Sequence, residues 1–443
     1  MLALTASALV FCYIYLLSLR VDLGLISLLG AELITIAFGE KSQIFGGIHL
    51  GPFDVVSICL LFAGIIRTGK TLKTINATRA IAIGYLALFA ISLGRGFYSN
   101  GLLVTANESR GFIGPLVATL YFLSSPADEK SIRRYTLTYL YFGAALCAVA
   151  VLATAELPVG MNALSSAEAA AIDGRCLPAT GAAAIAVSGI FSLGLSRYWQ
   201  KGLASEFIPI VYLALAIYLR HRTVWLMLLV AMAALLPLDA SLFRRLLPAA
   251  LIAGALVTLL VIYGSDSARS VGGGQFSESA TNTQTLEWRV NGWKELLFDE
   301  EQNPLTIAIG KSMGSGNWRI DPVSYRALTV APHSEYLQEY LRVGVIGALL
   351  MLLFGLRPLL KLWRLTKINP TAVYPSTSAW AIIVLATLVY GVTYGIGPHS
   401  YALLGIANAI ATRRRALEEA TASAESESNW TMTTAQCGIA VEI

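Results

Sequence analysis

Two arginines and a histidine share one short connection between apolar runs: Arg220, His221 and Arg222. Where such runs cross a membrane, a charge that faces lipid costs about 3 kcal/mol, so these side chains must reach an aqueous cavity or an anionic partner. They could equally form a hairpin tip whose arginines extend into the headgroup region. On the outer side such a group opposes the bias that places Lys and Arg in cytoplasmic loops, and this favours a functional role.

A tryptophan and an arginine are adjacent in a segment with helical periodicity, residues 286–297. Apolar residues recur there at the spacing of one helical face: Leu286, Val290, Trp293 and Leu297. This spacing predicts an amphipathic helix that lies on the membrane surface. Arg289 stands at the flank of the apolar face, aimed at the headgroup plane, and Trp288 is a candidate beside it.

A histidine precedes a later apolar run, in the sequence PHSEY at residues 332–336. Proline suits the first turn of a helix, so we expect a helix that begins near Pro332 with His333 in its first turn. The positive end of the helix dipole would favour the neutral imidazole, which can act as a general base. A lone histidine is more often structural. Glu335, Tyr336 and Arg342 follow on the same segment and are candidates for substrate binding.

Two other patterns resemble functional motifs. The sequence GKS at 310–312 looks like the end of a Walker A loop, but that loop needs glycine at position 305, where this chain has Leu305. We therefore reject a nucleotide site. The sequence PHS at 398–400 repeats residues 332–334, so by spacing alone His399 competes with His333. We expect His399 to matter much less, because no acidic and aromatic pair follows it.

The composition indicates that much of the protein surface faces lipid rather than water. Of 443 residues, 56% are hydrophobic and 13% are charged, whereas soluble domains carry roughly 25% charged residues. Such a chain cannot face water on all sides, so the sequence predicts an all-α polytopic membrane protein. The 5 cysteines are scattered singly, which provides neither metal-ligand spacing nor a disulfide framework.

Basic residues cluster between the apolar runs, and their positions predict which ends of the runs face the cytoplasm. The runs cover residues 2–19, 22–38, 53–66, 80–94, 111–126, 135–155, 179–196, 204–219, 224–239, 247–263, 344–360, 376–391 and 401–411. The clusters contain Arg67, Lys70, Lys73 and Arg79; Lys130, Arg133 and Arg134; Arg197 and Lys201; Arg244 and Arg245; Arg357, Lys361, Arg364 and Lys367; and Arg413, Arg414 and Arg415. Two runs separate neighbouring clusters, so every cluster can be cytoplasmic.

This parity divides the chain into four parts. We expect an N-terminal transmembrane bundle over 1–263, a large periplasmic loop with amphipathic helices over 264–343, C-terminal transmembrane helices over 344–411, and a disordered cytoplasmic tail over 412–443. Two runs before residue 39 place the N-terminus outside and give 13 spans. A count of 12 spans requires one run to be interfacial or re-entrant, and Glu32 within the second run favours a re-entrant segment.

The order of the motifs resembles the bacterial O-antigen ligase and polysaccharide polymerase family. An arginine turn, an Arg-Trp segment in a long outer loop, a glycine-rich stretch at 310–316, then Pro-His-x-x-Tyr-Leu and Gly-x-x-Gly follow one another over residues 215–350. The resemblance implies a membrane glycosyltransferase of the GT-C type. Such an enzyme is a multi-pass protein of the bacterial inner membrane whose active site faces the periplasm, and it acts in lipopolysaccharide or exopolysaccharide synthesis.

The resemblance also implies a reaction. A glycan would pass from undecaprenyl diphosphate to an acceptor hydroxyl without metal or other cofactor. The acceptor is lipid A core for a ligase and another lipid-linked unit for a polymerase, and the sequence leaves both open. Carried onto this chain, the catalytic residues are Arg222, Arg289 and His333. The family often has serine and asparagine where this chain has His221 and Ser334.

Elementary chemistry agrees with that assignment. Glycosyl transfer needs a base for the acceptor hydroxyl and cations for the charge on the leaving diphosphate. Arginine binds phosphate oxygens through two N–H groups and keeps its proton. The outer loop carries scattered carboxylates that form no tight metal-binding pair: Asp266, Glu278, Glu287 and Asp321.

Two functions outside enzymology compete with this interpretation. A transporter or flippase of lipid-linked saccharides would also be polytopic and would contain cationic cavities. Transporters commonly show internal repeats and charged or broken spans at the membrane midplane, whereas this chain shows no repeat and its charges gather at one rim. A passive scaffold is the other alternative, and it would leave Arg222, Arg289 and His333 replaceable. We favour the enzyme.

Overall fold

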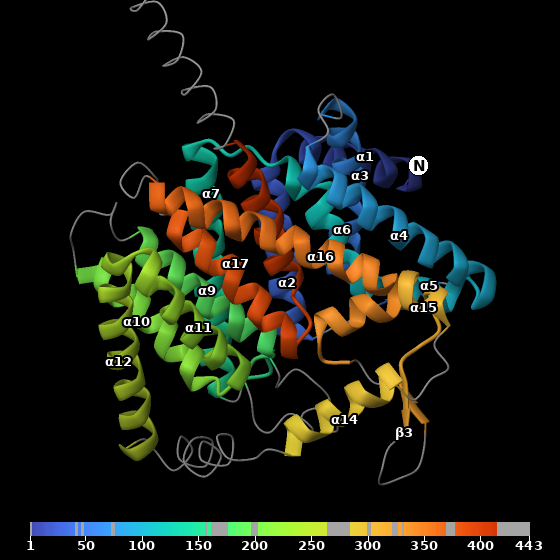
Figure 1. Ribbon diagram of the computed structural model, residues 1–443. Coiled ribbons are helices and arrows are strands. Elements are labelled where there is room, and N and C mark those ends of the chain that lie inside the picture. Colours follow the sequence, from blue (N-terminus) through green and yellow to red (C-terminus); the bar gives the residue numbers. More distant parts are fainter. Residues whose placement is uncertain are drawn as a thin grey trace, which may run out of the picture.

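The computed structural model describes residues 2–39, 43–45, 48–71, 76–155, 157–160, 176–195, 203–263, 284–298, 303–320, 327–329, 332–368 and 377–413 (Figure 1). Helices dominate these residues, and two short antiparallel hairpins accompany them. The predicted tail lies almost entirely outside the described residues, which end at residue 413.

The elements follow one another along the chain. They are α1 (Leu2–Leu19), α2 (Val21–Phe38), β1 (Gln43–Phe45), β2 (Ile48–Leu50), α3 (Pro52–Thr71), α4 (Ala77–Ser99), α5 (Leu102–Ser109), η1 (Arg110–Phe112), α6 (Ile113–Leu120), η2 (Phe122–Ser124), α7 (Glu129–Thr154), α9 (Ala179–Leu195), α10 (Leu203–Tyr218), α11 (Arg222–Leu238), α12 (Ala240–Tyr263), α14 (Gln284–Phe298), α15 (Pro304–Ile309), β3 (Trp318–Ile320), β4 (Ala327–Thr329), α16 (Glu335–Ile368) and α17 (Thr377–Thr393). A last helix covers residues 398–413.

Several helices have the length and composition of membrane spans. Among the described residues, 5 helices qualify in full, and shorter apolar helices accompany them in α1, α9, α10, α11 and α17. Large apolar side chains are exposed on the outer helices, for example Phe11, Phe62 and Leu251. Water would not solvate such a surface well. The predicted fold class, an all-α polytopic membrane protein, is confirmed.

Each apolar run of the sequence coincides with a helix, and two of them need comment. The run at 111–126 is divided into η1, α6 and η2 rather than forming one helix. The second run is the unbroken 18-residue helix α2, which has the length and composition of a full span rather than those of a broken re-entrant segment. Glu32 of α2 is buried and bonded to His399 instead, which satisfies its carboxylate inside the protein.

Two helix ends that carry basic clusters, those at Arg67 and Arg134, lie at one end of the bundle. Arg67 of α3 donates hydrogen bonds to the carbonyl of Ser18 and to the hydroxyl of Ser124, both at 2.8 Å. Arg134 of α7 lies 3.5 Å from Asp22 of α2. The helix α14 lies at the opposite end (Figure 1). These contacts place Arg67 and Arg134, from two of the six basic clusters, at the same end of the bundle.

Three helices form the buried centre of the bundle: α9, α17 and the last helix. Nearly all residues of α9 are buried, and most of them are Ala, Gly and Ser. Small residues let helix backbones approach closely where lipid supplies no hydrophobic force between helices. The helix α9 packs against α10 and α7, and α17 packs against α11 and α16. This centre fixes the ends of α11 and α17, which carry the candidate site.

The amphipathic helix α14 forms as predicted, but its apolar side packs on protein. Leu296 is buried against Leu337 and Leu341 of α16. The indole of Trp293 donates a hydrogen bond of 2.6 Å to the carbonyl of Pro332. The helix α14 thus lies across the start of α16, at the lower edge of the bundle in Figure 1.

The predicted start of the next helix is wrong. The helix α16 begins at Glu335, and His333 precedes it with a left-handed backbone, φ 49°. That conformation is incompatible with a helical first turn. The amide of Glu335 donates to the carbonyl of Tyr394 at 3.2 Å, and α14 holds Pro332, so tertiary contacts determine the path of this segment. Further along, α16 is kinked at Gly344.

Candidate functional site

Three predicted residues meet around a tyrosine that the sequence analysis did not select, Tyr394. The guanidinium of Arg289 lies over the Tyr394 ring, 4.6 Å from its centroid. The ring of His333 lies 6.3 Å from that of Tyr394 and 6.0 Å from that of Trp288. A guanidinium over an aromatic face is favourable by about 0.5–2 kcal/mol. The helix α14 and the segment before α16 are therefore joined at this point.

The end of α17 orients Arg289. Its Nη1 donates a hydrogen bond of 3.1 Å to the carbonyl of Thr393, the last residue of that helix. The final carbonyls of a helix have no partner within the helix and carry partial negative charge, so a cation there is stabilised. Tyr390, one turn earlier, stacks on Tyr394 at 5.5 Å. The end of α17 is thus both a cation acceptor and an aromatic platform.

Arg222 precedes a residue that contacts the same helix end. It is the first residue of α11, and the hydroxyls of Thr223 and Thr393 lie 2.8 Å apart. Arg220 and His221, just before α11, are buried. The His221 Nε2 atom lies 3.0 Å from the carbonyl of Leu177, which anchors the turn to the start of α9. Arg220 and His221 remain predictions as substrate-binding residues, and the structure gives His221 a role in holding the turn.

Glu335 and Tyr336 have partners within the protein. The Glu335 carboxylate accepts hydrogen bonds of 2.7 Å from the Tyr401 hydroxyl and from the amide of Ile396. The Tyr336 hydroxyl donates to the carbonyl of Leu388 in α17 at 2.7 Å. These contacts fasten the start of α16 to α17 and to the connection at 394–397. We expect both residues to position the site rather than to bind substrate.

Arg342 belongs to a different cluster. Its side chain is 1% exposed and is paired with Glu108 of α5, and it donates a hydrogen bond of 2.7 Å to Asn317. Glu108 also accepts from the amide of Gly314. These partners lie in α5 and the glycine-rich loop, so the structure does not bring Arg342 to Tyr394. Burial, and after it the nearby Arg342, lower the pKa of Lys311 in the same loop.

The glycine-rich loop, residues 310–317, packs on the end of α4. Arg95 donates a hydrogen bond of 2.9 Å to the carbonyl of Gly310, and the Asn100 amide donates one of 2.8 Å to that of Met313. Gly310 and Gly314 have φ of 79° and 89°, which only glycine adopts without strain. The loop therefore links α4, α5 and α16 through hydrogen bonds.

We expect Glu108→Gln to destabilise the protein. The substitution keeps the size of the side chain and removes the negative charge, so the buried Arg342 guanidinium loses its counter-charge. The free energy of unfolding should fall by about 1–3 kcal/mol. Thermal unfolding of the purified protein measures this effect, with the exposed Glu129→Gln as a matched control. Equal unfolding midpoints for the two variants would contradict a stabilising pair.

Thr393, Tyr394 and Glu108 were not predicted from the sequence. Tyrosine and threonine carry no charge at neutral pH, so the charge pattern of the sequence does not indicate Thr393 and Tyr394. Tyr390 and Tyr394 are four residues apart at the end of an apolar run, and this was the available signal. Of the loop carboxylates, Glu287 is exposed on α14, and the others, Asp266, Glu278 and Asp321, lie outside the described residues.

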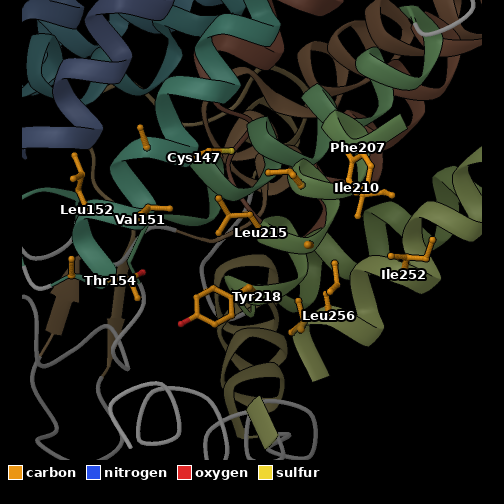
Figure 2. A pocket seen from close by; sticks show the side chains of 15 residues that line it. Cys147, Val151, Leu152, Thr154, Phe207, Ile210, Leu215, Tyr218, Ile252 and Leu256 are labelled. Carbon is orange, nitrogen blue, oxygen red and sulfur yellow. The ribbon is translucent and has the colours of Figure 1, made fainter. Parts of the chain in front are cut away.

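An apolar cavity lies between α7, α10 and α12 (Figure 2). Its volume is about 920 Å³. The lining residues are Cys147, Ala148, Val151, Leu152, Thr154, Ala155, Phe207, Ile210, Val211, Ala214, Leu215, Tyr218, Ile252, Leu256 and Val257. Tyr218 precedes Arg220 by two positions, so one end of the cavity lies at the arginine turn.

The part of the chain that carries the candidate site also matches a known family. Residues 207–352 match the family model described as O-antigen ligase. That range begins in α10 and ends in α16, and it contains Arg222, Arg289 and His333. No curated protein matches the chain. The family supports glycan transfer of the ligase or polymerase type in general. The matched segment and the multi-pass fold together confirm the predicted resemblance to the O-antigen ligase family.

Proposed function

We propose that the protein transfers a glycan from an undecaprenyl-diphosphate-linked donor to an acceptor hydroxyl at the periplasmic face of the inner membrane, without a metal. The observation that carries this proposal is the cluster of Arg289, Tyr394 and His333. It places a cation and an imidazole on one aromatic platform. The contact between Thr223 and Thr393 adds Arg222 at the same helix end.

The arginines suit the leaving diphosphate. The Nη1 atom of Arg289 is held by the Thr393 carbonyl, which fixes the plane of the guanidinium. The Nε atom of Arg289 is buried and has no hydrogen-bond partner within the described part of the chain. An unpaired buried donor costs about 1–3 kcal/mol. A phosphate oxygen reaching Nε after a small side-chain movement would remove this cost, so the arrangement favours an anionic ligand.

His333 suits the role of general base. Its ring is half-buried between Trp288 and Tyr394, which orients the imidazole. In the proposed reaction a ring nitrogen takes the proton of the acceptor hydroxyl while the hydroxyl oxygen bonds to the anomeric carbon. The bond between that carbon and the diphosphate oxygen breaks, and the leaving charge meets Arg289 and Arg222.

The apolar cavity suits the lipid part of the donor. Polyprenyl chains are apolar, and the cavity walls in Figure 2 are almost entirely hydrocarbon. One end of the cavity lies beside Tyr218, close in sequence to Arg220 and Arg222. A chain held there would deliver its diphosphate toward the arginine turn. The charge parity supports a periplasmic position for this end of the bundle.

Transfer by the purified protein tests the proposal. The protein in lipid vesicles would receive a polyprenyl-diphosphate-linked oligosaccharide with lipid A core, or with a second copy of the donor, as the acceptor. Product formation that persists in EDTA is the expected result. Inactivity with both acceptors would overturn the proposed function, and loss of activity in EDTA would overturn its metal independence.

The glycan profile of a deletion strain separates ligase from polymerase. A ligase defect leaves surface polymer that is not attached to core, whereas a polymerase defect leaves single repeat units. The same strain, complemented with each variant described here, provides an assay in cells.

We expect Ala214→Phe to impair the use of long-chain donors selectively. The added ring would occupy the cavity between α7, α10 and α12. The KM for a full-length polyprenyl donor should rise by about 10-fold, since losing the burial of two or so methylene groups costs about 1.5 kcal/mol. A donor with a short prenyl chain should be used normally. The control is Ala233→Phe on the exposed face of α11; equal effects on both donors would contradict the assignment.

A further inference from the structure

Two buried carboxylates hold the connection that carries Tyr394. Residues 394–397 join α17 to the last helix and form no regular structure. On one side, Glu335 accepts a hydrogen bond of 2.7 Å from the amide of Ile396. On the other, Glu32 of α2 accepts one of 3.2 Å from the amide of His399, and its carboxylate lies 2.6 Å from His399 Nδ1. Ile396 and the start of the last helix are therefore held by α16 and α2, which are far apart in sequence.

The pair of Glu32 and His399 lies deep inside the protein. Glu32 is 7% exposed and His399 is 1% exposed. The His399 ring lies 6.1 Å from that of Tyr139 and 5.9 Å from that of Phe142, both on α7. With Glu32 ionised, the Nδ1–H group donates to it, and Nε2 has no hydrogen-bond partner among the described residues. Three elements thus meet at this polar pair: α2, α7 and the last helix.

Packing alone does not account for this pair. Burying ionisable groups carries a desolvation cost, and apolar residues of similar volume in place of a buried pair are often neutral or stabilising by about 1–4 kcal/mol. Ionisable residues inside membrane proteins commonly serve function. An apolar pair could not form the hydrogen bonds that the Glu32 carboxylate accepts from the backbone amide and the Nδ1–H group of His399. These bonds fix the start of the last helix relative to α2.

We propose that Glu32 and His399 are positioning residues for glycan transfer. They fix the connection at 394–397, and with it the Tyr394 ring and the Thr393 carbonyl against which Arg289 lies. The inference rests on the proposed function, because it assigns the pair to the same site. Neither residue touches substrate; both act through Tyr394 and Arg289.

The physical basis is the sensitivity of transfer to geometry. A displacement of about 1 Å at a catalytic group can cost about 10²-fold in rate. His399 follows Ile396 by three positions, and Tyr394 precedes Ile396 by two. A shift at the start of the last helix therefore reaches the platform under Arg289 through a short stretch of backbone.

Two substitutions of His399 separate positioning from bulk. His399→Leu fills similar space without a donor to Glu32, and we expect it to lower kcat by about 10-fold with little change in KM for the acceptor. His399→Asn places an amide N–H near the position of Nδ1, and we expect it to recover most of the lost activity. Equal activity of His399→Leu and the wild type would overturn the proposal, as would failure of His399→Asn to exceed His399→Leu.

A double-mutant cycle with Arg289 tests the route of the effect. If His399 acts through Arg289, His399→Leu should cost little further activity in an Arg289→Lys background, since coupled residues are not additive. The matched control is Asn408→Leu, equally buried in the same helix and bonded to the carbonyls of Phe354 and Leu404. Its effect should be the same in both backgrounds. Additive losses for His399→Leu and Arg289→Lys would overturn the proposal.

Hydrogen exchange provides a readout that needs no activity. In the purified protein, Glu32→Gln should accelerate amide exchange in the peptide 394–401, which contains the amides of Ile396 and His399, and Asn408→Leu should not. Unchanged exchange would overturn the positioning role even if transfer is confirmed. Conversely, accelerated exchange in a protein without transferase activity would show that the proposed function fails while the contact between α2 and the connection holds.

Discussion

His333→Ala is expected to lower kcat by about 10²- to 10⁴-fold, the contribution of a positioned general base. The backbone at His333 is held by neighbours on both sides, through Trp293 to Pro332 and through the Glu335 amide to Tyr394. Removal of the imidazole should therefore leave folding and donor binding largely intact. Single-turnover transfer with saturating donor, compared with donor binding to the same variant, measures the two separately.

Two controls distinguish proton transfer from disturbance of the site. Added imidazole should partly restore turnover to His333→Ala, because it can enter the space of the lost ring and accept the proton. His399→Ala should lose much less than His333→Ala and should show no rescue, since its effect is on geometry. Normal turnover by His333→Ala would contradict the general-base assignment.

Arg289→Lys is expected to lower kcat/KM for the donor by about 10- to 150-fold, since a hydrogen bond to a charged group contributes about 1.5–3 kcal/mol. Lysine keeps the charge but loses the planar fork, which both stacks on Tyr394 and donates to Thr393. The loss should appear in donor affinity as well as in rate, unlike that of His333→Ala. Titration of the donor at fixed acceptor concentration measures both.

The control for Arg289 lies on the same helix. Lys294→Ala removes an exposed cation from α14 and should leave donor affinity unchanged. If the two substitutions have the same effect, then Arg289 contributes only general positive charge, and the assignment to the diphosphate fails.

The sequence predicted the membrane helices well because lipid imposes a simple rule. Each span must bury its backbone bonds and present apolar side chains, and long apolar runs report this directly. The run at 111–126 illustrates where the rule ends. Its composition is apolar throughout, yet the structure breaks it into η1, α6 and η2. Arg67 donates to the carbonyl and the hydroxyl of Ser124 there, a contact between distant segments that periodicity does not encode.

The candidate site was predictable only in part. His333, Arg289 and Arg222 stood out because charged groups are rare in this chain and these three were expected at the outer rim. The residues that Arg289 and His333 contact, Tyr394 and Thr393, did not stand out, because they look like ordinary residues at the end of an apolar run. Arg342 had the same signal as Arg289 but is paired with Glu108, more than two hundred positions earlier. Charge pattern identifies candidates, and tertiary pairing decides which of them are available.

The kink at Gly344 divides α16 into a first part beside the candidate site and a second part that spans the membrane. Gly344 has φ 70°, and a Cβ at that position would overlap the carbonyl of Ala308, so only glycine fits there. Spanning helices tilt when the thickness of the bilayer changes. In a continuous α16 this tilt would be transmitted to Glu335 and the neighbouring His333. We expect the non-helical backbone at Gly344 to take up this tilt, because α14 and α15 contact the first part of α16. The proposed transfer should then proceed at similar rates in bilayers of different acyl-chain length.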